Sequence, residues 1–283
     1  MIDETVDEIE EMQTHSSSVV AVKAAEALRD IAAEDYPSVE EFLRALDRNS
    51  SALRRANPSH ASLQNTQREI VERVEGADPA TVEEAGEVLE STVEDVVERV
   101  QNAKHAAAEN GAAVFEDGMT VLTHDYSSTV LEAVELAARA GKRLEVYVTE
   151  ARPRYLGRKT ARVLAEIDRV DAHLIVDSAA GHYLPECDRV VTGLTCIVGE
   201  TFYNRVGTYP IAATAADVGV PVTVVGSRAK IIEGGFAFEN EVRSGSEVMR
   251  EPAEGFSVGN PAYDATPTRL VDSVVTDDGI REF

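Results

Sequence analysis

The stretch MTVLTHDYSSTVLEAVELAARAGKRLEVYVTE, residues 119–150, decides the fold of this chain. It opens with a short apolar run rich in β-branched residues, 119–124, and continues into a stretch whose apolar residues recur at helical spacing, 128–141. A second short apolar run follows at 143–150. Because short β-branched runs favour strands and longer amphipathic runs favour helices, this stretch predicts a βαβ unit with two parallel strands.

The same alternation continues toward the C-terminus. Further strand-like runs are AHLIVDSA, DRVVTG and VPVTVVG, at 172–179, 188–193 and 220–226. Turn residues and prolines from 260 onward precede one apolar segment, which we expect to pack at an edge of the sheet. The pattern predicts an α/β fold with a mostly parallel sheet, in which ligands bind outside the carboxyl ends of the strands.

The N-terminal part of the chain has a helical period almost throughout. Ser38 stands three residues before a glutamate, which is a capping-box pattern, and an Asp-Pro pair precedes the last long helix, which we expect to end at Gly111. We therefore predict a helical N-terminal domain of residues 1–111, followed by a Rossmann-like α/β domain of residues 112–283.

The charge balance is strongly acidic. The chain has 27 basic and 51 acidic side chains, a formal net charge of −24, and only five of the basic residues are lysines. Such a surface predicts a halophilic protein, because concentrated salt screens the repulsion between carboxylates; an ordinary acidic cytosolic protein is the alternative. With so few cations, we expect no direct binding of nucleic acid through phosphate neutralisation.

The two cysteines, Cys187 and Cys196, form neither a disulfide framework nor a zinc-ligand pattern, so we expect no metal and no cofactor. The first residues are acidic and lack the apolar region of a signal peptide, and no run of 18 apolar residues occurs. These features predict a cytoplasmic protein without membrane association.

Four phrases that follow predicted strands carry a family resemblance. They are TEARPRYLGRKTA, DSAA, NRVGTYPIA and NPAYDATP, at 149–161, 177–180, 204–212 and 260–267. In this order and spacing they closely resemble the initiation factor 2B alpha/beta/delta family, which also contains ribose-1,5-bisphosphate isomerases and methylthioribose-1-phosphate isomerases. The resemblance covers essentially the whole chain. It implies a helical N-terminal domain and a Rossmann-like domain through which two copies dimerise.

The resemblance also implies two catalytic positions, and both have changed identity. In the isomerases a cysteine after the first strand takes part in proton movement, and a later aspartate assists it. Asp125 stands at the cysteine position and Thr195 at the aspartate position. From these losses we predict a non-catalytic or regulatory homologue that binds a phosphorylated sugar or nucleotide in the former isomerase pocket and contacts initiation-factor subunits.

The alternative prediction is an enzyme, namely a divergent sugar-phosphate aldose–ketose isomerase of the ribose-1,5-bisphosphate isomerase type. In that case Asp125, together with His124, Tyr126 or Asp177, performs the proton transfer. Asp125 and Tyr126 form either a new acid and phenol pair or a helix cap beside a packed ring. His124 either titrates near neutrality beside Asp125 or is a hydrogen-bonded structural histidine.

Several residues at the predicted strand ends are of types that bind anions. An N-terminal phrase that holds substrate phosphate through arginine in the family reads Asn57-Pro58-Ser59-His60 here, and the remaining cations still predict a site for a single phosphate. The alternatives are surface salt bridges for the arginines and a helix-capping role for Asp177. The candidate ligand-binding residues are Arg152, Arg154, Gly157, Asp177, Asn204, Arg205 and Lys230.

Overall fold

The computed structural model describes residues 2–10, 17–58, 60–232, 238–251 and 254–282. The chain divides into two compact units, Met1–Asn102 and Ala103–Phe283, and the division falls within one long helix, α6 (Val82–Ala112). The predicted change of period near residue 111 coincides with the end of that helix. Each unit has its own hydrophobic core.

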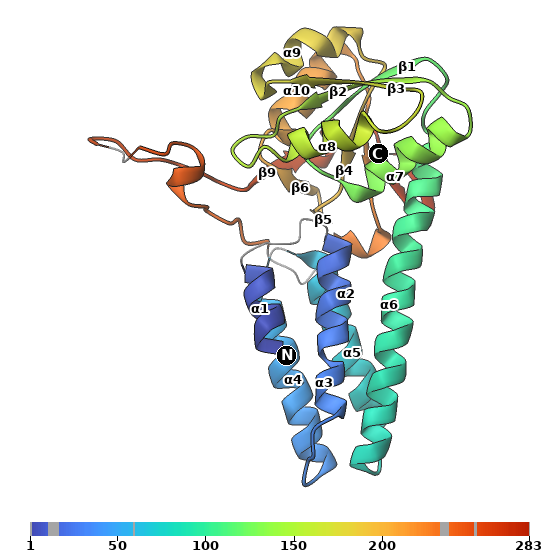
Figure 1. Ribbon diagram of the computed structural model, residues 1–283, viewed down its shortest axis with the longest axis vertical. Coiled ribbons are helices and arrows are strands. Elements are labelled where there is room, and N and C mark those ends of the chain that lie inside the picture. The colour runs from blue at the N-terminus through green and yellow to red at the C-terminus, as the bar shows by residue number, and fades with distance from the viewer. Residues whose placement is uncertain (1, 11–16, 59, 233–237, 252–253, 283) are drawn as a thin grey trace. The chain divides into compact units, whose positions relative to one another are not determined.

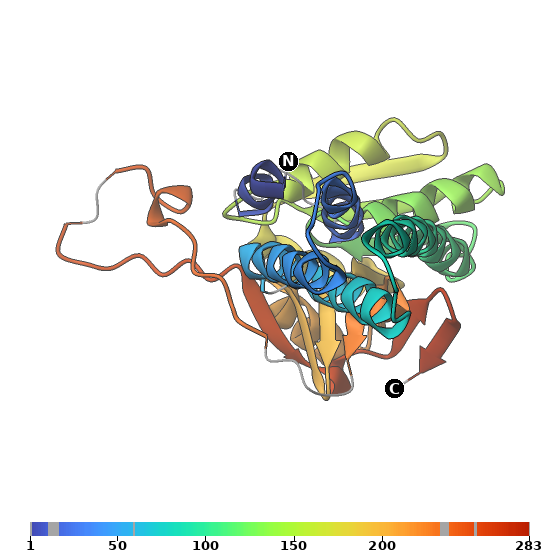
Figure 2. The same cartoon turned by 90° about the horizontal axis from the view of Figure 1, so that it is seen from below.

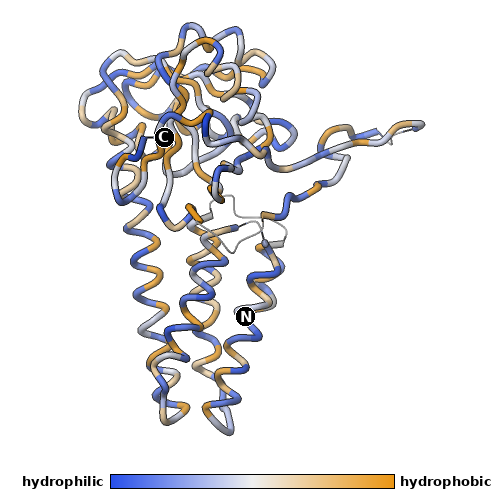
Figure 3. Tube along the Cα trace, turned by 180° about the vertical axis from the view of Figure 1, so that it is seen from behind, coloured by the Kyte–Doolittle hydropathy of each residue, from blue (hydrophilic) through white to orange (hydrophobic). Residues whose placement is uncertain are grey.

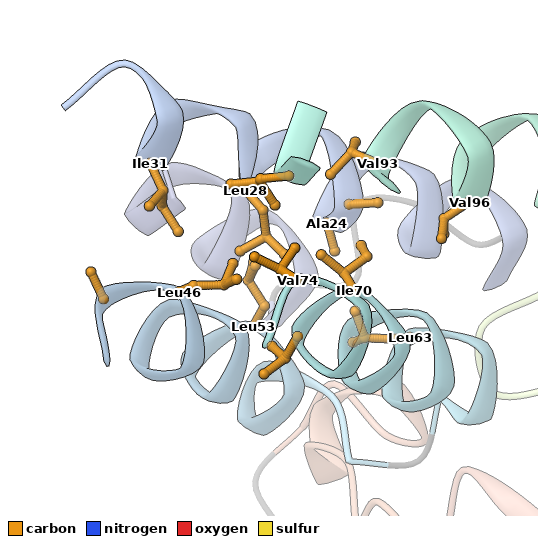
Figure 4. Close-up of a cluster of buried hydrophobic side chains, with 14 of the residues drawn as sticks. Ala24, Leu28, Ile31, Leu46, Leu53, Leu63, Ile70, Val74, Val93 and Val96 are labelled. Atoms are coloured by element: carbon orange, nitrogen blue, oxygen red, sulfur yellow. The ribbon is translucent and has the colours of Figure 1, made fainter. Parts of the chain in front are cut away.

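The first unit is helical, as the period of its sequence predicts. Besides the first part of α6, its helices are α1 (Ile2–Glu10), α2 (Ser17–Ala27), α3 (Arg29–Ala32), α4 (Val39–Ala56) and α5 (Ala61–Gly76). Figure 3 shows hydrophobic and hydrophilic residues alternating along these helices. The hydrophobic side chains meet in one core, which includes Leu28, Leu46, Leu53, Ile70 and Val93 (Figure 4).

Side-chain caps set the starts of two of these helices. The hydroxyl of Ser38 accepts a hydrogen bond from the backbone N–H of Glu41 at 3.3 Å, so α4 begins where the capping pattern predicts. Helix α6 begins at Val82, later than the Asp-Pro pair indicates. There the hydroxyl of Thr81 accepts from the N–H of Glu84 at 3.1 Å, and the Glu84 carboxylate accepts from the N–H of Ala80 at 2.8 Å, so two N–H groups at the helix start are satisfied by side chains.

The second unit is built on a seven-stranded sheet with the strand order β11-β10-β7-β4-β1-β2-β3. All neighbouring pairs are parallel except β10 with β11, so the prediction of a mostly parallel sheet is confirmed. The apolar C-terminal segment forms β10 and β11 at the edge. The strands are β1 (Met119–Thr123), β2 (Leu144–Thr149), β3 (Val170–Ile175), β4 (Arg189–Gly193), β7 (Val222–Val225), β10 (Ser273–Thr276) and β11 (Gly279–Glu282).

Helices cover both faces of this sheet (Figure 1). Successive residues of β1 show the alternation: Val121 belongs to the core beneath α7 (Ser128–Arg139) and α8 (Leu156–Leu164). Leu122 belongs to the core beneath α9 (Ala180–Tyr183) and α10 (Thr208–Val218). A strand buried on both faces reads as a continuous apolar run, which explains why these strands are visible in the sequence.

A second, four-stranded sheet with the order β8-β5-β6-β9 was not predicted. Its strands are β5 (Cys196–Val198), β6 (Thr201–Arg205), β8 (Ile231–Ile232) and β9 (Tyr263–Pro267). Two of them have only two or three residues, too few to show a period. The described residues between β8 and β9 include an excursion that extends away from both sheets of this unit (Figures 1 and 2). Within the described part of the chain, no helix has the length and apolar character needed to cross a bilayer.

Candidate functional site

The carboxyl ends of four neighbouring strands meet at one edge of the large sheet. In the order of the sheet, β7 leads toward Lys230, β4 leads into Thr195, β1 ends before Asp125, and β2 ends before Arg152. The parallel arrangement places all four connections on the same side. This is the edge at which α/β proteins bind their ligands.

A cavity of about 280 Å³ lies in this region. One acidic residue, Asp125, and four arginines line it, together with five uncharged residues. The lining residues are Asp125, Ala151, Arg152, Pro153, Arg154, Leu156, Arg205, Val206, Arg243 and Ala262. A concave site with several guanidinium groups around one carboxylate suits an anionic ligand that also has a proton to exchange.

Asp125 is held in this cavity through both its backbone and its side chain. Its φ of 66° is left-handed, a conformation that aspartate tolerates better than most residues. Its carbonyl accepts a hydrogen bond from the hydroxyl of Thr160 at 2.7 Å. Its carboxylate oxygen Oδ2 lies 3.5 Å from Nε of Arg205, and both side chains are nearly buried, with exposed fractions of 13% and 11%. The carboxylate is therefore fixed beside a permanent positive charge.

The loop after β2, which supplies two of the arginines, is strained and tightly held. Ala151 and Tyr155 have φ values of 57° and 59°, which cost a residue with a side chain free energy and often mark functional sites. A Cβ atom at Gly157 would lie 1.8 Å from the carbonyl oxygen of Thr149, so only glycine fits where α8 passes the end of β2.

Asp177 anchors the same loop. Its two carboxylate oxygens accept the backbone N–H groups of Ala151 and Arg152 at 2.8 and 2.7 Å. The expectation that it caps the helix following it is therefore wrong, since its acceptors serve the neighbouring strand connection. Asp177 positions the arginine loop but does not line the cavity.

The arginines of the cavity repel one another. Burial lowers the pKa of the Arg154 guanidinium, and the positive charges of Arg243 and Arg205 lower it further. Arg243 is balanced by Glu247, with a closest hydrogen bond of 2.6 Å. Arg152 donates to the carbonyl of Val248 at 3.1 Å. A bound anion would relieve the repulsion around Arg154.

Both ring nitrogens of His124 are engaged in hydrogen bonds within the protein. It is 2% exposed, with Nδ1 2.6 Å from the hydroxyl of Thr149 and Nε2 2.9 Å from the carbonyl of Val206. Because a carbonyl can only accept, Nε2 carries a proton and is not available as a base. A Cβ at Gly207 would lie 2.7 Å from the ring, so the backbone packs closely on it. The geometry supports the structural alternative for this histidine.

Tyr126 does not line the cavity either. The ammonium of Lys159 lies 4.2 Å from the centre of its ring, and the ring packs against the core beneath α7 and α8. Among the residues that line the cavity, Tyr126 is absent. The structure therefore does not assemble Asp125 and Tyr126 as an acid and phenol pair.

The second catalytic position of the resemblance lies in a polar cluster beside the cavity. The hydroxyl of Thr195 donates to Oδ1 of Asn204 at 3.0 Å, and Nδ2 of Asn204 donates to the hydroxyl of Thr208 at 3.1 Å. Lys230 is 7% exposed and donates to the carbonyl of Leu194 at 2.9 Å. Burial lowers the pKa of Lys230 to about 8.

Of the candidate ligand-binding residues, the structure thus brings Arg152, Arg154 and Arg205 to the cavity with Asp125. Gly157, Asp177, Asn204 and Lys230 do not line it; the first two shape the arginine loop and the last two belong to the adjacent cluster. Arg243 was missed in the sequence. It lies between β8 and β9, outside every strand-end pattern, so no sequence signal marked it.

The comparisons with known proteins agree with the fold. Residues 13–282 match the initiation factor 2 subunit family. A ribose 1,5-bisphosphate isomerase of Haloferax volcanii is 32% identical, over 97% of this chain and 87% of the relative, and one of Haloterrigena turkmenica is 34% identical, over 97% and 88%. The crystal structure of a Pyrococcus horikoshii translation initiation factor eIF-2B superposes with a TM-score of 0.83 at 26% identity, covering 99% of this chain and 96% of that one.

These findings correct the functional prediction. The prediction of a non-catalytic or regulatory homologue is wrong, because the relatives at 32% and 34% identity over nearly the whole chain are named ribose 1,5-bisphosphate isomerases. They favour the enzymatic alternative. The resemblance itself, together with the fold class that it implies, is confirmed: the chain belongs to the initiation factor 2 subunit family.

Proposed function

We propose that this protein is a sugar-phosphate aldose–ketose isomerase in which Asp125 transfers the proton. The observation that carries the proposal is the nearly buried carboxylate of Asp125 in a cavity lined by four arginines. The relatives named ribose 1,5-bisphosphate isomerase support a phosphorylated pentose as the substrate.

The reaction requires one group that takes a proton from carbon and returns it to the neighbouring carbon. For a pentose 1-phosphate, the bond between C1 and the ring oxygen opens, the base removes the proton from C2, and the same group delivers a proton to C1. The C2 hydroxyl becomes the ketone, and its proton balances the one taken up by the former ring oxygen. No net oxidation occurs, so the chemistry requires only acid and base groups.

A carboxylate is suited to this role. Triosephosphate isomerase uses a glutamate carboxylate as the base for the corresponding step. A cysteine must first lose its proton, whereas a carboxylate is already ionised at neutral pH. Asp125 can therefore stand in place of the thiol that the resemblance implies, provided that the substrate carbon lies within reach of Oδ1 or Oδ2.

The arginines then bind the phosphate. Guanidinium groups donate two parallel hydrogen bonds to a phosphate and keep their charge at any physiological pH. Arg154 is the central candidate, since burial and then the positive charges of Arg243 and Arg205 lower the pKa of its guanidinium, against the opposing effect of Glu247 and Asp125. Binding a dianion there removes an unfavourable interaction as well as adding favourable ones.

We further propose that the enzyme works as a homodimer in a salt-rich cytoplasm. The dimer follows from the family resemblance, and the salt-rich setting is supported by the net charge of −24. Light scattering in molar KCl gives the mass of the assembly directly. A monomer mass at micromolar concentration would contradict the dimer.

The proposal is tested by incubating the purified protein with ribose 1,5-bisphosphate in molar KCl and following the phosphorus NMR spectrum. We expect resonances of ribulose 1,5-bisphosphate to appear and to require enzyme. Ribose 5-phosphate in a parallel sample shows whether the 1-phosphate is needed. A stable spectrum for both sugars, from protein with native circular dichroism, would refute the isomerase.

A further inference from the structure

Tyr263 does not itself line the cavity, but it contacts Arg205, which does, and no strand-end pattern assigns it a role. It is the first residue of β9 and stands directly opposite Arg205 of β6 in the antiparallel pair. The guanidinium of Arg205 lies over its ring, with Cζ 4.6 Å from the ring centre. Tyr263 is 3% exposed, and its neighbour Ala262 lines the cavity.

The backbone and ring of Tyr263 are fully engaged. Asn240 accepts from its N–H at 3.2 Å and donates to its carbonyl at 2.8 Å. Its ring meets Phe238 edge to face, with 5.2 Å between ring centres. The residue is therefore held in one position by contacts that do not involve its hydroxyl.

The hydroxyl group of Tyr263, unlike its backbone and ring, makes no such contact within the described part of the chain. Among the residues that the structure describes, the buried Oη of Tyr263 has no hydrogen-bond partner, and neither does the buried Nη1 of Arg205. Buried polar groups in proteins are almost always paired, because leaving one unpaired forfeits the hydrogen bonds it made to water. Two such donors on facing residues beside a cavity are a suitable pair to share one acceptor.

The charges around the phenol keep it a donor. Burial raises its pKa; the positive charge of Arg205 opposes this, and the negative charge of Glu241 adds to the rise. Asp125 and Arg154 are also close enough to act on it. A phenol that stays protonated donates its O–H to an anionic oxygen, as the tyrosine in the oxyanion hole of ketosteroid isomerase does.

We propose that Tyr263 Oη and Arg205 Nη1 together bind the C2 oxygen of the substrate, which gains negative charge as its hydroxyl proton leaves after Asp125 has taken the proton from C2. This inference rests on the proposed isomerase function. Arg205 joins the two parts of the site, since its Nε lies 3.5 Å from Oδ2 of Asp125 while its guanidinium covers the ring of Tyr263. The oxygen that these donors hold is thus attached to the carbon next to the base, and the phosphate lies with Arg154.

The test is Tyr263→Phe, which keeps the ring, the Asn240 hydrogen bonds and the contacts with Arg205 and Phe238. We expect kcat to fall by about 10²- to 10³-fold, the effect of losing one oxyanion donor, with KM changed less than threefold. Tyr203→Phe is the matched control: Tyr203 stacks on the same Phe238 with 4.1 Å between ring centres but is not paired with Arg205. It should retain wild-type kcat.

A binding measurement separates failure of this inference from failure of the isomerase proposal. A phosphorylated four-carbon aldonohydroxamic acid has an ionised oxygen on a planar carbon in place of the C2 enolate oxygen, and calorimetry should show it binding at least tenfold more weakly to Tyr263→Phe than to wild type. Inorganic phosphate should bind both proteins equally. Equal affinity for the hydroxamate, or a kcat within twofold of wild type, would overturn the role of Tyr263 and leave the isomerase standing. A wild-type protein that neither turns over ribose 1,5-bisphosphate nor binds the hydroxamate would overturn both.

Discussion

Substituting Asp125 by asparagine removes the carboxylate charge and little else. Asparagine has nearly the same shape and tolerates the left-handed φ of 66° as well as aspartate does. The hydrogen bond from Thr160 to the carbonyl of residue 125 is kept, because it involves the backbone. The change therefore isolates two roles of this carboxylate, the charge balance of Arg205 and the proposed proton transfer.

The effect on stability follows from the distance to Arg205. With Nε and Oδ2 3.5 Å apart, Coulomb's law with an effective dielectric constant of about 20 gives an attraction of about 5 kcal/mol before desolvation is subtracted. The amide of the Asp125→Asn variant keeps a dipole toward Arg205 but leaves its guanidinium without the carboxylate, so we expect the free energy of unfolding to fall by about 1–3 kcal/mol. Urea unfolding in molar KCl measures this.

The effect on activity is larger. A positioned general base contributes about 10²- to 10⁴-fold, so kcat should fall by about 10³-fold, or about 4 kcal/mol of activation free energy. The phosphorus NMR assay at saturating substrate follows the loss, with Asp171→Asn as the control, because the Asp171 side chain is 79% exposed. An Asp125→Asn enzyme with a kcat within threefold of wild type would refute the assignment of the base.

The remaining predictions concern the phosphate, the buried lysine and the salt. Arg154→Met should abolish the rise in melting temperature that inorganic phosphate gives the wild type, while Arg158→Met should not, because Arg158 is paired with Glu150 at 2.7 Å outside the cavity; an unchanged phosphate response in Arg154→Met would remove it from the site. Burial lowers the pKa of Lys230 to about 8, so the unfolded chain binds more protons than the folded one above that pH, and stability should rise between about pH 8 and 10. Lys230→Met should flatten that rise in urea titrations, and parallel profiles for the two proteins would contradict the lowered pKa. Lowering KCl from about 1 M to 0.1 M lengthens the Debye length from about 3 to 10 Å, so the melting temperature of a chain with net charge −24 should fall steeply; a melting temperature indifferent to KCl would remove the halophilic interpretation.

The large sheet was predictable because its central strands are buried on both faces. Val121 and Leu122, for example, enter different cores, so both are apolar and the run stands out. The small sheet was not predictable, because β5 and β8 are too short to show a period and their partners lie far along the chain.

The candidate site was predictable in part. The resemblance marked Asp125, Arg152, Arg154 and Arg205, which the fold does bring together. It could not give the direction of each side chain, which is why the roles of His124 and Asp177 emerged only from hydrogen bonds.

Two further residues show the limit of strand-end reasoning. Tyr263 stands inside a recognised phrase, but its unpaired hydroxyl is a property of packing. Arg243 reaches the cavity from the excursion between β8 and β9, where neither period nor turn pattern indicates a site. Tertiary structure alone assigns residues of this kind.

The most direct test of the central claim is to run the reaction of ribose 1,5-bisphosphate in heavy water and molar KCl, with wild type and Asp125→Asn side by side. The account predicts that wild type forms ribulose 1,5-bisphosphate carrying deuterium at C1, because the carboxylate exchanges its proton with solvent, and that Asp125→Asn forms almost none. Equal rates of product formation by the two proteins would contradict proton transfer by Asp125.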